Sequence, residues 1–235
     1  QKYYQYPLNL IKKTIIDSKK KYFFFIDDMI PSKRLLDIAK ILKPLKIKWT
    51  CQLKPTKDFT YNVLKKLKES GLEMIIWGVE SGNDKILKLM NKGTNKHDVA
   101  KVLEHSHQAG IKNVTYIMFG FPTETEKEFL DTIKFLQENQ DNIDLISTSI
   151  FGLQKNSIIY NNPKKYEIYD IKEKERTILE PKITYKLRKG LTQEEASKLR
   201  KRYKNILEKI NNYPNMMNFF REHMFVKTKI YKKLK

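Results

Sequence analysis

Between residues 8 and 160, amphipathic segments alternate with short apolar runs. The apolar runs predict five strands, at 22–26, 47–53, 74–79, 113–119 and 143–151. Hydrophobic residues at helical spacing predict helices at 8–19, 31–42, 58–69, 84–90, 95–109 and 125–138. Runs that are apolar throughout are typical of parallel strands covered on both faces, so the pattern predicts an α/β fold. A doubly wound sheet and a (β/α) barrel fit it equally well.

After residue 160 the pattern changes. Residues 161–180 are polar around Pro163 and predict a linker. Residues 181–235 predict a basic helical extension, with one helix over 192–210 that begins at a Thr192–Glu195 capping box. A second helix is predicted beyond Pro214. The predicted organisation is therefore a domain at 1–160, a linker at 161–180 and an extension at 181–235.

The composition excludes several classes of protein. The chain has 235 residues, 40% of them hydrophobic, which is enough for a buried core. The longest apolar runs are too short to span a bilayer, and no signal peptide is visible, so we expect a cytoplasmic protein. The single cysteine, Cys51, excludes a disulfide framework, a Cys-rich zinc site and an iron–sulfur cluster held by this chain alone. We expect it to be a buried apolar side chain.

The net charge of +20 comes almost entirely from lysine. Arginine, which is preferred for bidentate phosphate and base contacts, is rare, so the charge favours biased codon usage over a selected polyanion-binding surface. Residues 181–235 nevertheless carry 16 basic and 4 acidic side chains. A contact surface for RNA or an anionic membrane would therefore lie in this extension.

The candidate chemistry lies at the carboxyl ends of the predicted strands, where α/β proteins bind ligands. Four of the five strand ends carry glycine or carboxylate residues, namely Asp27, Asp28, Glu80, Gly120 and Gly152. Asp28 also fits a turn or helix cap. His97, His105 and His107 are spaced as ordinary helix residues, so no metal site is predicted in this chain.

Three segments together resemble the radical S-adenosylmethionine (radical SAM) enzymes. Residues 77–93, WGVESGNDKILKLMNKG, are similar to a glycine-flanked strand end of that family, and 119–125, FGFPTET, resemble its GxPGET turn. Residues 22–28, YFFFIDD, resemble the second barrel strand of the cobalamin-associated branch. The resemblance covers residues 3–170. It implies a partial (β/α)6 TIM-like barrel with strands two to six and a C-terminal helical extension.

The resemblance implies cofactors that this chain cannot hold unaided. Members of the family bind a [4Fe–4S] cluster through a CxxxCxxC loop after the first strand, and the cluster binds SAM. Neither that strand nor that loop occurs here, so we expect the cluster ligands upstream in the same polypeptide and expect the chain alone to be inactive. A reductant such as flavodoxin or ferredoxin is the implied partner, and cobalamin is a further candidate cofactor.

The resemblance also assigns residues to SAM and to the substrate. Asp27 and Asp28 would meet the SAM amino group, Glu80 the ribose and Lys92 the SAM carboxylate. The expected cofactor contacts also include Ser81, Tyr116, Gly120, Phe151 and Gly152. On the substrate side we expect Trp49, Gln52 and Lys54, and Tyr116 could face that side too. Two turns depart from the family pattern, with Thr123 where glycine is common and Leu153–Ser157 where a PGT segment is common.

The sequence thus predicts the C-terminal part of a radical SAM enzyme. Such an enzyme reductively cleaves SAM to a 5′-deoxyadenosyl radical that abstracts hydrogen, and methyl transfer is one outcome in this branch. The substrate is not indicated. The alternative is a degenerate, non-catalytic barrel that binds RNA or anionic surfaces through 181–235.

Overall fold

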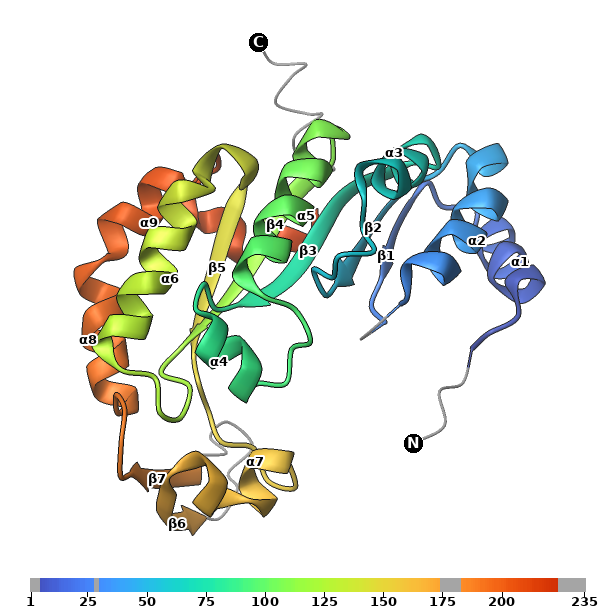
Figure 1. Ribbon diagram of the computed structural model, residues 1–235. Coiled ribbons are helices and arrows are strands. Elements are labelled where there is room, and N and C mark those ends of the chain that lie inside the picture. The colour runs from blue at the N-terminus through green and yellow to red at the C-terminus, as the bar shows by residue number, and fades with distance from the viewer. Residues whose placement is uncertain (1–4, 28–29, 174–182, 224–235) are drawn as a thin grey trace.

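The structure, a computed structural model, describes residues 5–27, 30–173 and 183–223. Its centre is a parallel sheet whose strands follow one another in chain order (Figure 1). These strands are β1 (Tyr22–Phe25), β2 (Lys48–Leu53), β3 (Leu72–Glu80), β4 (Lys112–Phe119) and β5 (Leu145–Ile150). The predicted α/β fold class is confirmed, because five parallel strands with intervening helices match the partial TIM-like barrel expected from the sequence.

One helix precedes the first strand and the others connect successive strands, and together they cover one face of the sheet (Figure 1). They are α1 (Leu8–Ser18), α2 (Ser32–Leu42), α3 (Tyr61–Glu69), α4 (Asp84–Leu89), α5 (Lys96–Gln108) and α6 (Glu126–Glu138). Short 3-10 segments, η1 (Lys43–Leu45) and η2 (Gln140–Asn142), follow α2 and α6. Side-chain caps on Thr60, Asn83 and Asn95 fix three helix starts. The helix predicted at 31–42 begins one residue later, because Pro31 takes the N-cap position and Ser32 is the first helical residue.

The two faces of the sheet bury different sets of residues. The face toward the helices holds most of the core, including Trp49, Cys51 and Leu53 of β2. The opposite face holds a smaller apolar cluster of Met74, Ile76, Val114 and Leu145, which packs against Met217 from the C-terminal region. Since side chains alternate along a strand, the position of a residue within β2 or β3 decides on which face of the sheet its side chain packs.

The strand β1 lies at the edge of the sheet. Its sequence, Tyr22–Phe25, predicts a fully buried strand, but Tyr22 is exposed and the other three residues are only half-buried. Among the described residues β1 pairs with β2 alone. An edge strand keeps one side open, which explains why a continuous apolar run does not produce full burial here.

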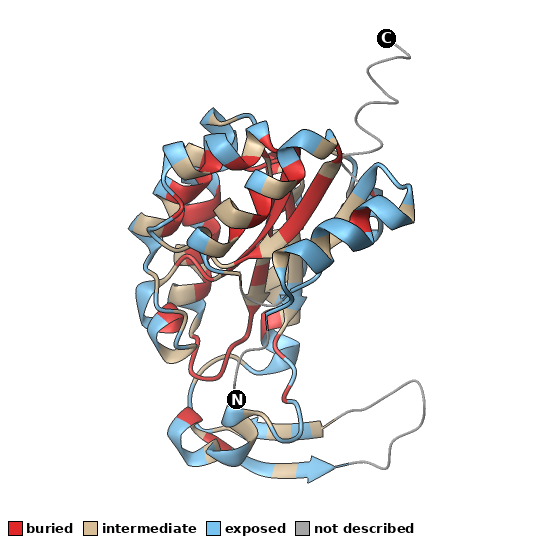
Figure 2. Cartoon of the chain, turned by 90° about the vertical axis from the view of Figure 1, so that its right-hand side faces the viewer, coloured by how far each residue is buried: buried red, intermediate tan, exposed pale blue. Residues whose placement is uncertain are grey.

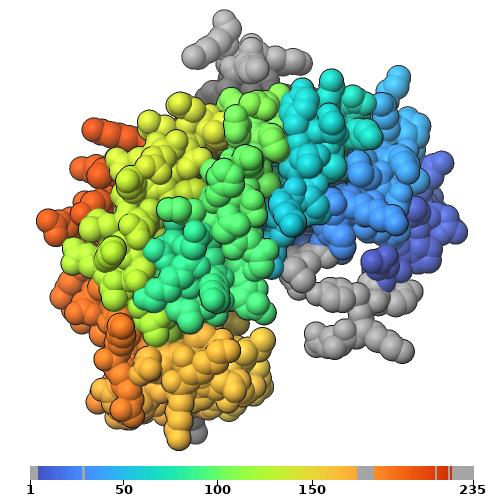
Figure 3. Space-filling model, viewed as in Figure 1, coloured from blue at the N-terminus to red at the C-terminus, as the bar shows by residue number. Residues whose placement is uncertain are grey.

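The region after β5 contains helices and strands where the sequence predicts a linker. It contains α7 (Ile158–Asn161), the 3-10 segment η3 (Pro163–Tyr166) and β6 (Ile168–Glu173), which pairs antiparallel with β7 (Ile183–Leu187). The expected linker at 161–180 therefore carries η3 and a strand, and the expected helical extension begins with another strand. This hairpin lies at the lower end of the molecule in Figures 2 and 3, and most of its residues are exposed or half-buried (Figure 2).

The C-terminal region packs on both faces of the sheet. The predicted helix over 192–210 is interrupted at Tyr203, giving α8 (Gln193–Arg202) and α9 (Lys204–Ile210). The capping box at Thr192 and Glu195 is confirmed. Beyond Pro214 the chain forms two 3-10 segments, η4 (Asn215–Phe219) and η5 (Arg221–His223), and the rest of the predicted second helix lies outside the described residues. None of the helices in the described ranges has the length and apolar character that a bilayer crossing needs.

Candidate functional site

The carboxyl end of β3 is bent by an irregularity in its pairing with β4. The register between the two strands shifts between Gly78 and Glu80. Glu80 has a φ of 67°, in the left-handed region that residues other than glycine seldom adopt. Such strained residues cluster at functional sites. The bend turns the Glu80 carboxylate back over Gly78.

Glu80 forms an ion pair with Lys92 above Gly78. The Lys92 Nζ lies 3.1 Å from the Glu80 Oε1, and the two side chains are 21% and 18% exposed. A Cβ atom on residue 78 would lie 3.1 Å from that oxygen and 3.4 Å from that nitrogen. The missing side chain of Gly78 therefore makes room for the pair. Both groups stay within reach of solvent, so both can contact a ligand.

Lys54, at the end of β2, brings a second ammonium group to the same edge. Burial, followed by the charge of Lys92, lowers the pKa of Lys54. The Cβ position of Gly93 lies 3.6 Å from the Lys54 Nζ. The Thr94 hydroxyl donates a hydrogen bond of 2.8 Å to the carbonyl of Pro55, which ties the two loops together. We call Lys54, Glu80 and Lys92 the strand-end cluster.

Of the other residues expected on the substrate side, Gln52 lies on the face opposite the helices and Trp49 lies on the face toward them. Gln52 pairs in register with Ile76, which lies on the face opposite the helices. Trp49 is three positions away and is completely buried in the helix-side core. Its indole nitrogen donates to the carbonyl and hydroxyl of Ser70. Strand alternation puts residues an odd number of positions apart on opposite faces, so Trp49 cannot share a surface with Gln52.

At the first strand end, Asp27 is exposed and Asp28 lies outside the described residues. Asp27 forms no ion pair in the described part of the chain, and it is close enough to Cys51 to act electrostatically on its thiol. This arrangement leaves the Asp27 carboxylate open to solvent at the same edge of the sheet as the strand-end cluster.

Ser81, expected to contact the cofactor, is directed into the protein. Its side chain is completely buried, its hydroxyl lies 3.1 Å from the Thr132 hydroxyl, and it accepts a hydrogen bond from the backbone of Asn83. Through these hydrogen bonds, the Ser81 hydroxyl holds the start of α4 against α6. The side chain therefore has a structural position and does not reach the strand-end surface.

Tyr116 lies on the face opposite the helices and is covered from the C-terminal region. It pairs in register with Gly78, and the guanidinium of Arg221 lies 5.2 Å from the centre of its ring. The Arg221 Nε donates a hydrogen bond of 2.5 Å to the Tyr116 hydroxyl. The C-terminal region thus reaches the middle of the sheet, a contact that the sequence does not indicate.

In the turn after β4, a backbone N–H group bonds to a side chain of the same turn. The N–H of Gly120, expected to form part of an adenine shelf, donates to the Glu124 carboxylate at 2.5 Å. Glu124 is completely buried, and its other oxygen has no partner among the described residues. Burial raises the pKa of Glu124 to about 7, although the hydrogen bond from Gly120 opposes it, and the charge of Glu128 adds a smaller increase. The sequence does not mark Glu124 as a functional candidate, because its position four residues after Gly120 gives no signal of burial.

The backbone conformation and packing of this turn explain why glycine is favoured at two of its positions. Gly120 has a φ of 72°, and a Cβ there would lie 2.8 Å from the Cβ of Ala196 in α8. Thr123 has a φ of 75°, which accounts for the glycine that resembling proteins commonly carry at this position. Phe151, also expected near adenine, packs at 5.3 Å edge-to-face against Phe121 and is buried, whereas Gly152 beside it is open.

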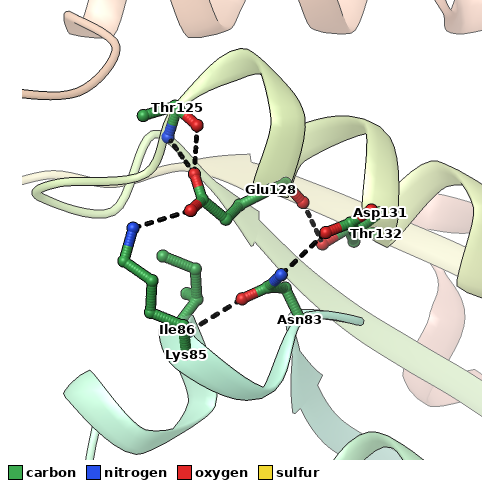
Figure 4. Close-up of polar contacts among 7 residues, drawn as sticks. All are labelled: Asn83, Lys85, Ile86, Thr125, Glu128, Asp131 and Thr132. Carbon is green, nitrogen blue, oxygen red and sulfur yellow. Dashed lines mark hydrogen bonds and ion pairs between the residues drawn. The ribbon is translucent and has the colours of Figure 1, made fainter.

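A second group of polar residues links α4 to α6 (Figure 4). The amide of Asn83 donates to Asp131 at 2.8 Å, and the Lys85 ammonium donates to Glu128 at 2.6 Å. Glu128 also accepts from the backbone N–H of Thr125 at 2.8 Å. Partial burial acts to raise the pKa of Glu128, but the bonds from Lys85 and Thr125 outweigh it and hold the pKa at about 2. We call these residues the α4–α6 network. The sequence predicts the two helices, at 84–90 and 125–138, but not the contacts between them.

The described residues offer no ligand set for a metal. They contain no group of three or more His, Cys, Asp or Glu side chains that could bind one. Cys51 is completely buried on the helix side of β2, and burial raises the pKa of its thiol, with a smaller contribution from Asp27. A [4Fe–4S] cluster therefore does not fit the residues described here. SAM does fit, because the ion pair over Gly78 provides a carboxylate and an ammonium in a space that a Cβ would fill.

The sequence profile of the radical SAM superfamily matches residues 2–136, more than half of the chain. The chain belongs to the radical SAM superfamily. The match includes Glu80, Lys92, Lys54 and the turn at Gly120, so the strand-end cluster lies within the family domain.

Relatives of known sequence include two named as methyltransferases. Bacteriochlorophyllide d C-12(1)-methyltransferase of Chlorobaculum tepidum is 28% identical over 66% of this chain and 36% of its own length. An uncharacterized methyltransferase of Pyrococcus horikoshii is 27% identical over 71% of this chain and 39% of its own. The tRNA-2-methylthio-N(6)-dimethylallyladenosine synthase of Thermotoga petrophila is 27% identical over 59% and 32%. The chain thus spans about a third of the length of these curated relatives.

Solved structures support the fold. Coproporphyrinogen III oxidase from Escherichia coli, a radical SAM enzyme, superimposes with a TM-score of 0.62 at 14% identity, over 86% of this chain and 45% of its own. The radical SAM methyltransferase TsrM from Kitasatospora setae, whose structure contains cobalamin and a [4Fe–4S] cluster, gives a TM-score of 0.53 at 14% identity, over 62% and 31%. The predicted resemblance to this superfamily is confirmed.

Proposed function

We propose that this chain forms the SAM-binding part of a radical SAM enzyme that transfers a methyl or methylthio group. The names of the curated relatives support the type of transfer. The observation that carries the proposal is the Glu80–Lys92 ion pair, half-buried over Gly78 at the carboxyl edge of the sheet. In parallel α/β folds this edge is where ligands bind.

The residues of the pair suit the polar ends of SAM. Lys92 has three N–H donors and gives one to Glu80, so the others are free to bind the SAM carboxylate. Glu80 has two oxygens, and the second can accept from a ribose hydroxyl. Gln52 and Asp27 extend the polar surface along neighbouring strand ends. The protein thereby orients the ligand, while the exposure of both side chains allows it to enter.

When reduced and bound to SAM, a [4Fe–4S] cluster in this family supplies the electron that cleaves the cofactor. The described residues of this chain do not hold that cluster, so ligands from elsewhere in the protein, and a reductant such as flavodoxin or ferredoxin, belong to the proposal. The contribution of this chain is to bind and orient SAM and to shield it with the helices and the C-terminal region.

Isothermal titration calorimetry with SAM tests the proposal on the chain as it stands. The wild type should bind, and Glu80→Gln and Lys92→Met should each weaken binding by 10- to 100-fold, roughly 1.4–2.8 kcal/mol, since each removes a charge-assisted hydrogen bond to SAM. The matched control is Lys43→Met, which removes a lysine from an exposed ion pair with Glu69. Its SAM affinity should equal that of the wild type.

Unchanged affinity in both site variants would reject the site. If the chain binds no SAM but binds RNA or anionic vesicles, with affinity that falls steeply as salt rises, the alternative of a basic interaction module would replace the proposal. The packing of Ala196, Leu207 and Ile210 into the core argues that much of the extension serves the fold instead.

A further inference from the structure

Lys54 is a half-buried cation without a counterion in the described part of the chain. It takes part in none of the ion pairs and side-chain hydrogen bonds found there. Its neighbour Lys92 already has a carboxylate partner in Glu80. The strand-end cluster therefore has two ammonium groups for one carboxylate, a net charge of +1 at a half-buried edge.

A half-buried charge without a partner is costly, and proteins retain such groups where a ligand supplies the partner. The surroundings of Lys54 fit this use. The lowered pKa of its ammonium has burial and the Lys92 charge as its causes, and both would be offset by a bound anion. Gly93 stands beside it with a φ of 63° and no side chain to cover it.

We propose that Lys54 binds an anionic group of the substrate, a carboxylate or a phosphate, next to the SAM site. The inference rests on the proposed function, because it takes Lys92 as the partner of the SAM carboxylate. Glu80 already forms an ion pair with Lys92, so the Lys54 ammonium is the one that can pair with a second anion. Lys54 directly follows β2 and lies two positions after Gln52, which can add an amide donor.

Equilibrium dialysis with inorganic phosphate, measured with and without saturating SAM, tests the proposal. The wild type should bind phosphate in the presence of SAM, and Lys54→Met should weaken this binding at least fivefold. Lys54→Arg, which keeps the charge, should restore it. Lys43→Met lowers the net charge equally at a distant, exposed pair and should leave phosphate binding unchanged, which corrects for non-specific binding to a chain of charge +20.

A second arm identifies the source of the anion. If Lys54 held the carboxylate of SAM itself, phosphate would compete with SAM but not with 5′-methylthioadenosine, which lacks that carboxylate. Competition of this kind would overturn the proposal, as would phosphate binding that is the same in Lys54→Met and wild type.

The proposed function and this inference can fail separately. Loss of SAM binding with intact, Lys54-dependent phosphate binding would reject the SAM site and leave an anion site at Lys54. Normal SAM binding without Lys54-dependent phosphate binding would reject the anion site alone. Circular dichroism and thermal unfolding of Lys54→Met and Lys54→Arg show whether either variant is folded, and the arginine variant keeps the test decisive if methionine perturbs the fold.

Discussion

Two polar regions border the end of β3, and they differ in how their charges are satisfied. In the α4–α6 network, Asn83, Lys85, Glu128 and Asp131 each have a partner at 2.6–2.8 Å (Figure 4). In the strand-end cluster, two ammonium groups share one carboxylate, and Glu80 has a positive φ. Both regions include residues at or directly after the end of β3, Glu80 in one and Asn83 in the other. Only the first is complete without a ligand.

This difference predicts that substitutions in one region change stability and that substitutions in the other change ligand binding. A satisfied network holds elements in place and gains little from any added group. An under-satisfied, strained cluster costs stability and is kept where a ligand completes it. Substitutions in the α4–α6 network should therefore change the free energy of unfolding, and substitutions in the strand-end cluster should mainly change ligand affinity.

The largest expected effect is at Gly82, where the network meets the core. A Cβ there would lie 2.4 Å from the Cβ of Phe135 and 3.0 Å from the Cα of Thr132, so Gly82→Ala forces α6 away from β3. We expect a loss of about 3 kcal/mol of unfolding free energy. Urea denaturation measures it. Gly152→Ala is the matched control, since no atom lies within 4 Å of its added Cβ. Equal stability of the two variants would contradict the packing described here.

The pH dependence of Glu124 should give the next largest effect. Its pKa is about 7 in the folded protein and about 4.5 when unfolded, so the protonated form stabilises the fold. This contribution is complete below pH 4.5 and is lost as the pH rises through 7. Between pH 5 and pH 8 the wild type should lose about 2 kcal/mol of stability that Glu124→Gln does not lose. Parallel pH profiles of the two proteins would show that the carboxyl is not buried in this way.

Glu128, four residues further on, should behave in the opposite sense and with a smaller effect. Its pKa of about 2 lies below the unfolded value, so its ionised form stabilises the fold above pH 4.5, and this contribution disappears as the pH falls toward 2. Glu128→Gln should cost about 1.5 kcal/mol at pH 7 and almost nothing near pH 2. Glu138→Gln, at an exposed pair with Lys134 at 3.7 Å, is the control and should cost less than about 0.5 kcal/mol. Chemical denaturation at both pH values decides whether the network stabilises the fold.

The sequence predicts the strands and helices of the sheet well because each carries a regular pattern. Apolar runs locate all five strands to within a few residues, and the capping box at Thr192 and Glu195 locates the start of α8. The hairpin of β6 and β7 is missed because its strands are short, polar and mostly exposed, which resembles a linker. The full burial expected of β1 is wrong because burial depends on neighbouring strands, not on the strand itself.

The site is predicted only in part, for physical reasons. Glu80 and Lys92 meet because a bulge in β3 and the turn after α4 bring together residues 12 apart. Trp49 and Gln52 are three positions apart, so strand alternation alone places them on opposite faces of the sheet. The contact of Arg221 with Tyr116 joins residues 105 apart, and no local pattern in one sequence indicates such a pairing. Local chemistry is readable from sequence, whereas long-range placement is not.

The smallest expected effect is at Lys54, and it has the opposite sign from the changes at Gly82 and Glu128. Burial and the Lys92 charge lower the pKa of Lys54, so its ammonium opposes folding at neutral pH, an effect that disappears as the pH approaches the unfolded value of about 10.5. Lys54→Met should therefore gain about 0.5 kcal/mol at pH 7. Lys43→Met, at an exposed ion pair, should be neutral or slightly destabilised. Urea denaturation at pH 7 and pH 10 measures both. A loss of more than about 1 kcal/mol in Lys54→Met would mean that the protein already satisfies this charge, and the strand-end cluster would then resemble the α4–α6 network instead of contrasting with it.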